Sequence, residues 1–357
     1  MLKNKFLLYP ILLFGILFSL DKIFLIEELK KLIKTDFTHI YYETRETLID
    51  SIAKDEELKS GKKKFMLILG SSRLLYFDAK ELKEYYPEWV IYNLSSAVTT
   101  PAYYDYFLRR VLSTGRIPDL VLLETDPNQF NENSPVFKSS NLTYSFNLSY
   151  VLENAVLFGK DNVSFFLGKQ LFASSKNKPH LDTAWKRYND PNFSTISAMQ
   201  DVTKNFLITN RGHSLPIVES YVERDFSSLE ATSKRTMDWV YASFKLSKMQ
   251  FEFYEKLLTE LQKNKIPTLI VIPQTSIPMQ KMLLESSFYP SWKKEILAKT
   301  KNHGYSILDM MNSSEYYCNA FVDGGHMAKD CYHPFMRFVM MERFRLEKKE
   351  PSPNELR

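Results

Sequence analysis

The sequence predicts an α/β protein built on a parallel β-sheet. Five apolar runs have the length of buried strands: residues 65–69, 89–94, 120–123, 268–272 and 305–308. Amphipathic stretches of helix length alternate with them: residues 74–86, 101–115, 233–264, 290–303 and 332–347. Strands that are apolar along their whole length are typical of parallel sheets, which helices cover on both faces. We therefore expect a central parallel sheet of about five strands, with any ligand beyond the carboxyl ends of these strands.

The composition allows a large core and argues against several classes of protein. The chain has 357 residues, 44% of them apolar, and a net charge of +5. Because its basic residues are scattered and are not interleaved with aromatic residues, we expect no nucleic-acid partner. The absence of G-x-G-x-x-G and G-K-[ST] loops argues against a nucleotide-binding protein. No C-x-x-C or H-E-x-x-H motif is present, so we expect neither a metal nor a cofactor.

The N-terminus predicts a membrane anchor over residues 1–26. Two lysines precede an apolar run at residues 6–20, and a second apolar patch, residues 23–26, follows Asp21 and Lys22. Together these reach the length of about 20 residues that a bilayer requires. A poor cleavage site favours an uncleaved signal anchor, with a cleaved signal peptide as the alternative. The lysines predict a single span with the N-terminus inside and the rest of the chain exported. In a bacterium this corresponds to the inner (cytoplasmic) membrane, with the main domain on the periplasmic or extracellular side.

Four regions follow from these patterns. Residues 27–63 read as a helical linker, and residues 64–347 as the α/β domain. The last ten residues, 348–357, have the composition of a disordered tail. Within the domain, strand–helix alternation stops over residues 127–232, which we interpret as an insertion above the carboxyl edge of the sheet. It could be a lid, a substrate wall or a surface elaboration.

The first strand ends in a Gly-Ser-Ser segment, residues 70–72, which raises the possibility of a nucleophile. A serine attacks an acyl carbon only when a base takes its proton and donors hold the oxyanion. Two of the six histidines, His326 and His333, follow an aspartate by three residues, namely Asp323 and Asp330. Such an aspartate can bind the imidazole Nδ1–H and leave Nε2 as the base. The alternatives are a helix cap at the serines and a surface turn at the glycines.

Two further features lie beside these motifs. Cys318 and Cys331 enclose Asp323 and His326. In an exported domain a disulfide there would close a loop of about 14 residues and contribute about 3 kcal/mol; two reduced, buried cysteines are the alternative. Arg73 follows the serines and could bind an anionic group or form a surface salt bridge.

The Gly-Ser-Ser block and the Asp-x-x-His before the final helix resemble the first and last blocks of SGNH (GDSL-like) hydrolases. The resemblance covers about residues 64–130 and 265–347 and implies a flavodoxin-like three-layer sandwich. It also implies Ser72 as nucleophile, His326 as base and Asp323 as the orienting acid.

The overlapping pair Asp330 and His333 also fits short versions of the last block. We favour Asp323 and His326 because the glycines between them leave the loop free to bring the imidazole to the serine.

The middle blocks depart from the family pattern. Residues 93–100, "NLSSAVTT", lack the glycine whose N–H helps to form the oxyanion hole, so the N–H of Ser96 or Ala97 would have to replace it. In "ETDPNQF", Asp126 stands where the family has an asparagine, so Asn128 would have to donate instead. These departures also allow a site that has lost activity.

Single-span members of this superfamily include proteins of teichoic acid D-alanine transfer and of alginate O-acetylation. The anchor followed by "GSSR" resembles more closely an uncharacterised bacterial family known chiefly from spirochaetes. The resemblance implies an esterase or O-acyltransferase acting on acyl esters of a cell-surface glycan or lipid. It also implies a polytopic membrane acyltransferase as a partner. The alternative function is an inactive SGNH-like scaffold or glycan-binding protein of the cell envelope.

Overall fold

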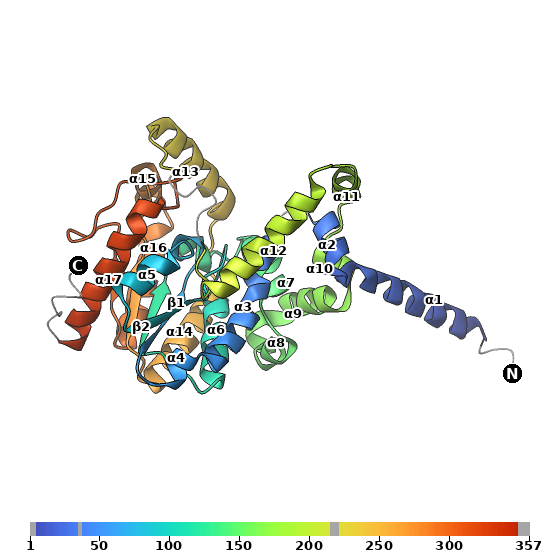
Figure 1. Ribbon diagram of the computed structural model, residues 1–357, viewed down its shortest axis with the longest axis horizontal. Helices are drawn as coiled ribbons and strands as arrows, with labels where there is room; N and C mark the ends of the chain where they lie inside the picture. The colour runs from blue at the N-terminus through green and yellow to red at the C-terminus, as the bar shows by residue number, and fades with distance from the viewer. Residues whose placement is uncertain (1–4, 35–37, 215–220, 349–357) are drawn as a thin grey trace.

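The computed structural model describes residues 5–34, 38–214 and 221–348, and its centre is one parallel β-sheet (Figure 1). The strands are β1 (Lys64–Leu69), β2 (Trp89–Asn93), β3 (Leu120–Glu124), β4 (Thr268–Ile272) and β5 (Ile307–Asp309). Their order in the sheet is β2-β1-β3-β4-β5, and every neighbouring pair is parallel. The predicted α/β class and the five-stranded parallel sheet are confirmed.

Helices make up most of the remaining chain. Before the sheet come α1 (Lys5–Asp21), α2 (Glu27–Ile33), α3 (Thr38–Lys54) and α4 (Glu56–Lys59). Within its first half come α5 (Ala79–Tyr85) and α6 (Pro101–Ser113). The inserted region holds α7 (Leu142–Tyr144), α8 (Leu148–Glu153), α9 (Ala155–Leu171), α10 (Ala173–Asn177), α11 (Leu181–Tyr188) and α12 (Phe193–Thr209). The chain closes with α13 (Phe226–Val240), α14 (Lys248–Lys263), α15 (Ile277–Glu285), α16 (Tyr289–Asn302) and α17 (Tyr332–Glu347).

The sheet carries a hydrophobic core on each face because successive residues of a strand point to opposite sides. In β1, Phe65, Leu67 and Leu69 pack with α3, α6, α14 and α16. Met66 and Ile68 point the other way and pack with α5 and α17. Each strand of this kind is buried on both faces, which explains why the strands read as continuous apolar runs.

The region expected to be a linker is helical, as predicted, but α3 is part of the folded domain. Leu48, Ile49 and Ile52 of this helix are buried in the core beside the sheet. Because these apolar residues lie on one helical face, α3 gains stability by packing and does not act as a spacer.

The stretch predicted as one helix, residues 233–264, is two helices, α13 and α14. They are separated near Ser243, which has a left-handed φ of 49°. Ser247 then begins α14, and its hydroxyl accepts the Gln250 N–H at 3.3 Å. The helix α15 was not predicted at all.

The insertion was expected above the carboxyl edge of the sheet; its first residues, 127–130, directly follow β3 there, and part of its end returns to the same edge. The carbonyl of Arg211 accepts the Asn93 N–H at 2.8 Å, and Ser214 N–H binds the Leu75 carbonyl at 3.0 Å. The helix α12 packs along α3, and α10 and α11 lie beside the base of α1 (Figure 1). A role of this region as a lid stays a prediction.

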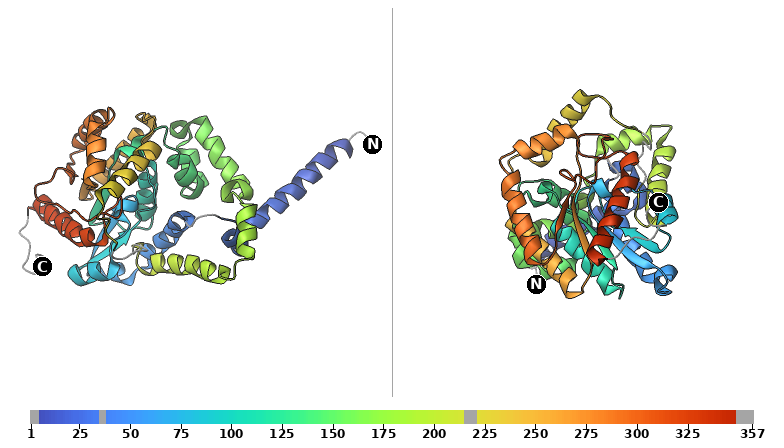
Figure 2. Two further views of the ribbon diagram at one scale, coloured as in Figure 1. Left: turned by 90° about the horizontal axis from the view of Figure 1, so that it is seen from above. Right: turned by 90° about the vertical axis from the view of Figure 1, so that its left-hand side faces the viewer.

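The N-terminal helix α1 projects away from the rest of the molecule (Figure 2). The stretch Leu8–Leu25 is long and apolar enough to cross a membrane, and none of it is buried in the structure. This agrees with a single-pass anchor. The predicted disordered tail, apart from its first residue, lies outside the described residues.

Candidate active site

Ser72 begins a short 3-10 turn directly after β1, at the carboxyl edge of the sheet. The turn needs Gly70, since a Cβ at that position would lie 2.7 Å from the Cβ of Leu74. Ser71 supplies the cap, because its Oγ accepts the Arg73 N–H at 3.3 Å. Either serine was considered as the cap of the helix predicted at residues 74–86, but that helix, α5, is capped by Asp78. Ser71 caps the 3-10 turn instead, and the hydroxyl of Ser72 is left for another partner.

That partner is His326. The Oγ of Ser72 lies 2.7 Å from Nε2 of His326. On the other side of the ring, Nδ1 lies 2.9 Å from both carboxylate oxygens of Asp323. The three side chains form a continuous chain of hydrogen bonds from hydroxyl to imidazole to carboxylate. Such an arrangement lets the imidazole accept the serine proton while the carboxylate stabilises the resulting imidazolium.

Asp323 is held in its ionised form. Burial by itself would raise the pKa of this carboxyl group, but hydrogen bonds and the charge of His326 outweigh it. The N–H groups of Gly325 and His326 add bonds of 2.8 and 2.9 Å to Oδ1. The pKa of Asp323 is therefore lowered to about 2. An ionised carboxylate keeps the proton of a neutral His326 on Nδ1, which leaves Nε2 as the acceptor.

The loop between Asp323 and His326 is fixed by its neighbours, and the expected freedom of its glycines is wrong. A Cβ on Gly324 would lie 2.3 Å from Oγ of Ser233 and 2.7 Å from the backbone of that residue in α13. The Gly324 N–H donates to Oγ1 of Thr232 at 3.0 Å, and its carbonyl accepts the Ser276 hydroxyl at 2.9 Å. Glycine is present there for close packing, and the packing sets the position of the imidazole.

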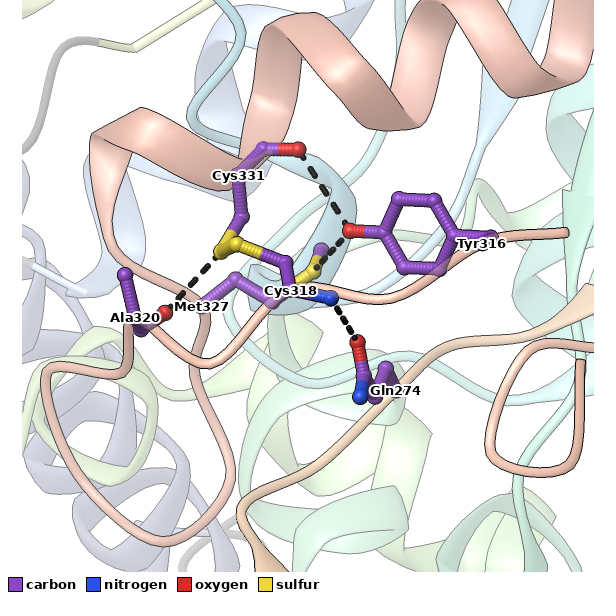
Figure 3. Close-up of a disulfide and its surroundings, with 6 residues drawn as sticks. All are labelled: Gln274, Tyr316, Cys318, Ala320, Met327 and Cys331. Carbon is purple, nitrogen blue, oxygen red and sulfur yellow. Dashed lines mark hydrogen bonds between the residues drawn. A yellow bond between two sulfur atoms is a disulfide. The ribbon is translucent and has the colours of Figure 1, made fainter. Parts of the chain in front are cut away.

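A disulfide between Cys318 and Cys331 encloses this loop (Figure 3). The Cα atoms of the two cysteines are 5.7 Å apart. The Cys318 N–H donates to Oε1 of Gln274 at 3.0 Å, which ties the bridge to the segment after β4. The bond that the spacing suggested is present, and it limits the conformations of the loop that carries Asp323 and His326.

The second pair of residues, Asp330 and His333, is not brought to the serine. Asp330 is exposed in a 3-10 turn before α17. The ring of His333 packs on Tyr85 of α5, with centroids 4.3 Å apart. In the described part of the chain neither residue contacts Ser72, so the geometry selects Asp323 and His326.

Of the groups expected to donate to an oxyanion, one already has a hydrogen-bond acceptor in the protein, as far as the structure describes it, and the others do not. The N–H of Ser96 donates to the Gly70 carbonyl at 3.2 Å, so it is already engaged and is not available to an oxyanion in this structure. Among the described residues, the N–H groups of Ala97 and Ser72 have no hydrogen-bond acceptor. The side-chain amide of Asn128 likewise has no protein partner within the described ranges; it lines a cavity of about 360 Å³ whose lining does not include Ser72, Asp323 or His326. These three groups are available to a ligand.

Arg73 and Asp126 form a buried ion pair behind the serine. Arg73 is 5% exposed and Asp126 is 1% exposed, so neither a surface salt bridge nor a substrate-binding role for the pair is borne out. The Tyr241 hydroxyl adds a 2.8 Å hydrogen bond to Oδ1 of Asp126. Burial opposes the charge of Arg73, but the neighbouring carboxylate raises the pKa of Arg73 above its usual value.

Sequence reasoning missed Glu124, the last residue of β3. Its carboxylate accepts the Ser71 N–H at 2.6 Å and the Ser71 hydroxyl at 2.7 Å. Gln129 is also near, with Nε2 at 3.4 Å. The side chain is 1% exposed, and burial raises the pKa of Glu124. A single acid at the end of the otherwise apolar strand "LVLLE" was the available signal, since a buried carboxylate requires donors.

Fold and site together define an α/β protein with a serine–histidine–aspartate chain at the carboxyl edge of a parallel sheet. A family profile described as "Protein of unknown function (DUF1574)" matches residues 1–343, and the chain belongs to this family. The match includes the apolar N-terminal helix, the whole sheet, the insertion and most of α17. Among curated proteins no match is found.

Proposed function

We propose that this protein is a membrane-anchored serine hydrolase or O-acyltransferase of the SGNH-like type. The hydrogen-bonded chain from Ser72 through His326 to Asp323 is the observation that carries the proposal. A serine hydroxyl 2.7 Å from an imidazole that a carboxylate orients has the arrangement of an activated nucleophile.

The reaction proceeds by two acyl transfers. The Oγ of Ser72 attacks the acyl carbon while its proton passes to Nε2 of His326. The leaving alkoxide takes that proton, and the acyl group remains esterified to the serine. An incoming hydroxyl group, from water or from a sugar, then loses its proton to Nε2 of His326 and takes the acyl group. As the acyl bond to Oγ breaks, His326 returns this proton to Oγ, which restores the serine. The N–H groups of Ser72 and Ala97 and the amide of Asn128 are the donors assigned to the oxyanion.

Two features support the SGNH-like assignment. The strand order 2-1-3-4-5 is that of flavodoxin-like folds, in which the site lies at the carboxyl edge where the order reverses. In addition, the nucleophile follows the first strand and the acid–base pair precedes the last helix. These positions agree with the order of the family blocks that the sequence resembles.

The substrate we assign is an acyl ester of a cell-envelope glycan or lipid. The apolar helix α1 supports this choice, because it would keep the site near the membrane on the exported side of the chain. By the same resemblance, a polytopic membrane acyltransferase would deliver the acyl group. Transfer to a sugar would require exclusion of water from the acyl-enzyme, which the insertion could provide.

A fluorophosphonate probe tests the nucleophile directly. The full chain, solubilised in mild detergent, is compared with Ser72→Ala, His326→Ala and His333→Ala. We expect labelling of the unchanged protein and of His333→Ala, no labelling of Ser72→Ala, and labelling of His326→Ala slowed by at least about 10²-fold. Equal losses in both histidine variants would contradict the assignment of His326.

One observation favours a second function, an inactive scaffold or glycan-binding protein. The second-block N–H of Ser96 is engaged with Gly70 instead of facing the site. If the folded full chain is not labelled at all, this second function is the better one.

A further inference from the structure

The base of α1 is held by the insertion. The Asp21 carboxylate accepts the Ser174 N–H at 2.9 Å and also binds the Ala173 N–H, so it caps the N-terminus of α10. Lys22 binds the Leu171 carbonyl, and Asn177 Nδ2 donates to the Phe24 carbonyl at 2.7 Å. The contacts between residues 21–24 and 171–177 fix this part of the insertion to the end of the apolar helix.

A further contact lies about one helical turn deeper in the apolar span. The ring of Phe172 packs edge-on against Phe18, with centroids 6.2 Å apart. Phe18 belongs to the stretch Leu8–Leu25 that is apolar enough to cross a bilayer. If that stretch is within lipid, the junction of α9 and α10 is at the level of the lipid boundary.

The neighbouring helix α11 continues the same surface. It packs on α2, where the His180 N–H donates to the Ile33 carbonyl at 3.2 Å. Its residues 181, 185 and 188 fall on one helical face because their spacing is four and then three. All three are large and apolar or aromatic, and all three are exposed: Leu181 by 76%, Trp185 by 70% and Tyr188 by 74%.

We propose that α11 and the α9–α10 junction lie in the bilayer interface as a second membrane contact. We call this surface the collar face; it consists of Leu171, Phe172, Leu181, Trp185 and Tyr188. All five residues are exposed, and Figure 1 shows α10 and α11 grouped with α2 where α1 leaves the molecule.

The chemistry of the collar face fits lipid headgroups better than a protein partner. Trp and Tyr are the residues that concentrate at the boundary between headgroups and acyl chains, because their rings are apolar with one polar atom. Residues 171–190 also contain four basic and only two acidic side chains. A basic amphipathic segment of this kind is attracted to anionic lipid.

Spin labelling of the full chain in lipid vesicles tests the proposal. The two native cysteines form a disulfide, so a cysteine introduced by Trp185→Cys or Tyr188→Cys is the reactive thiol. Two controls carry the label elsewhere: Asp182→Cys, on a different side of α11, and Trp239→Cys, on α13 at 60% exposure. The vesicles contain phosphatidylcholine with or without phosphatidylglycerol. Collisions with oxygen, which partitions into lipid, are compared with collisions with a water-soluble nickel chelate.

We expect labels at residues 185 and 188 to be reached by oxygen and at least about fivefold less by nickel than the label at residue 239. The label at residue 182 should be intermediate, and phosphatidylglycerol should increase the contrast. Equal nickel access at residues 185 and 239 would overturn the proposal. Protection of residue 185 from both reagents would also overturn it, since that result indicates a protein occupant or a second copy of the chain.

Discussion

Gly324 lies so close to Ser233 of α13 that no side chain fits between them. A Cβ on this glycine would be 2.7 Å from both Cα and N of Ser233. Backbone atoms cannot rotate away as a side chain does, so the loop or the helix would have to move. The position of His326 relative to Ser72 thus depends on this contact.

The variant Gly324→Ala is expected to abolish fluorophosphonate labelling of Ser72 or slow it by at least about 10²-fold, because a displacement of about 1 Å in a catalytic group has effects of that size. The matched control is Gly325→Ala, whose Cβ would meet nothing closer than Oδ1 of Asp323 at 3.8 Å. Labelling rates of both folded variants provide the measurement. Similar rates for the two variants would show that the contact does not position the imidazole.

The variant Asp323→Asn tests the orienting acid. An amide cannot stabilise the imidazolium as a carboxylate does, so the labelling rate should fall by about 10²- to 10⁴-fold. Asp330→Asn, which alters the exposed acid before α17, should leave the rate unchanged. A loss in Asp330→Asn with none in Asp323→Asn would reverse our assignment.

The lowered pKa of Asp323 predicts a dependence of stability on acid pH. The pKa of this group is about 2 in the folded chain, against an ordinary value of 3.8. A group with a depressed folded pKa stabilises above its unfolded pKa, and this stabilisation is lost as pH falls from about 4 to about 2. Because the Asp323 side chain is 37% exposed, we expect only about 1 kcal/mol.

Urea unfolding at pH 5 and at pH 2.5 measures this contribution. The unchanged chain should lose about 1 kcal/mol more than Asp323→Asn between these two pH values. Identical losses would mean that Asp323 does not titrate differently in the folded and unfolded chains.

Removing only one partner of the buried ion pair between Arg73 and Asp126 should lower the stability of the protein. Asp126→Ala leaves a buried guanidinium without its carboxylate, which should lower the free energy of unfolding by about 3–5 kcal/mol. The control is Glu132→Ala, which breaks the exposed pair of Glu132 with Lys245 and should change stability by less than about 1 kcal/mol. Urea denaturation compares the two variants, and equal effects would argue against a structural role of the buried pair.

Loss of the disulfide should weaken the site before it unfolds the domain. The bridge spans 13 positions, so Cys318→Ser with Cys331→Ser should reduce stability by about 3 kcal/mol. The labelling rate of Ser72 should fall as well, because the enclosed loop carries the base. Unchanged labelling in a demonstrably disulfide-free chain would show that the contacts of Gly324 alone hold the loop.

The sequence predicted four strands almost to the residue because their apolar runs are buried on both faces. The last strand is shorter than its apolar run, since Tyr305 lies outside the ladder. The break between α13 and α14 was missed because it contains neither proline nor glycine. Its left-handed residue is Ser243, a type that gives no warning of that conformation.

At the site, local motifs predicted the three residues of the hydrogen-bonded chain but not their surroundings. The Asp-x-x-His spacing identified two candidate pairs, and the resemblance to the family pointed to Ser72; the structure then selected Asp323 and His326. Glu124 and the pairing of Arg73 with Asp126 depend on side chains from neighbouring strands, and no local pattern reports such contacts. The sequence also gave no sign that residue 324 must be a glycine, because Ser233, which it contacts, is about 90 positions away in the chain.

Helix α13 touches both halves of the site. Near its middle, Thr232 and Ser233 hold the loop of His326, and at its end Tyr241 binds Asp126 behind the nucleophile. Ser72 and His326 are 254 positions apart, yet one rigid helix relates them. The spacing of the site is therefore independent of how much chain connects its parts. Chains with shorter or longer insertions, or circularly permuted versions of this chain, can therefore keep the same distance between Ser72 and His326. The condition is that α13 keeps its contacts with Gly324 and with Asp126.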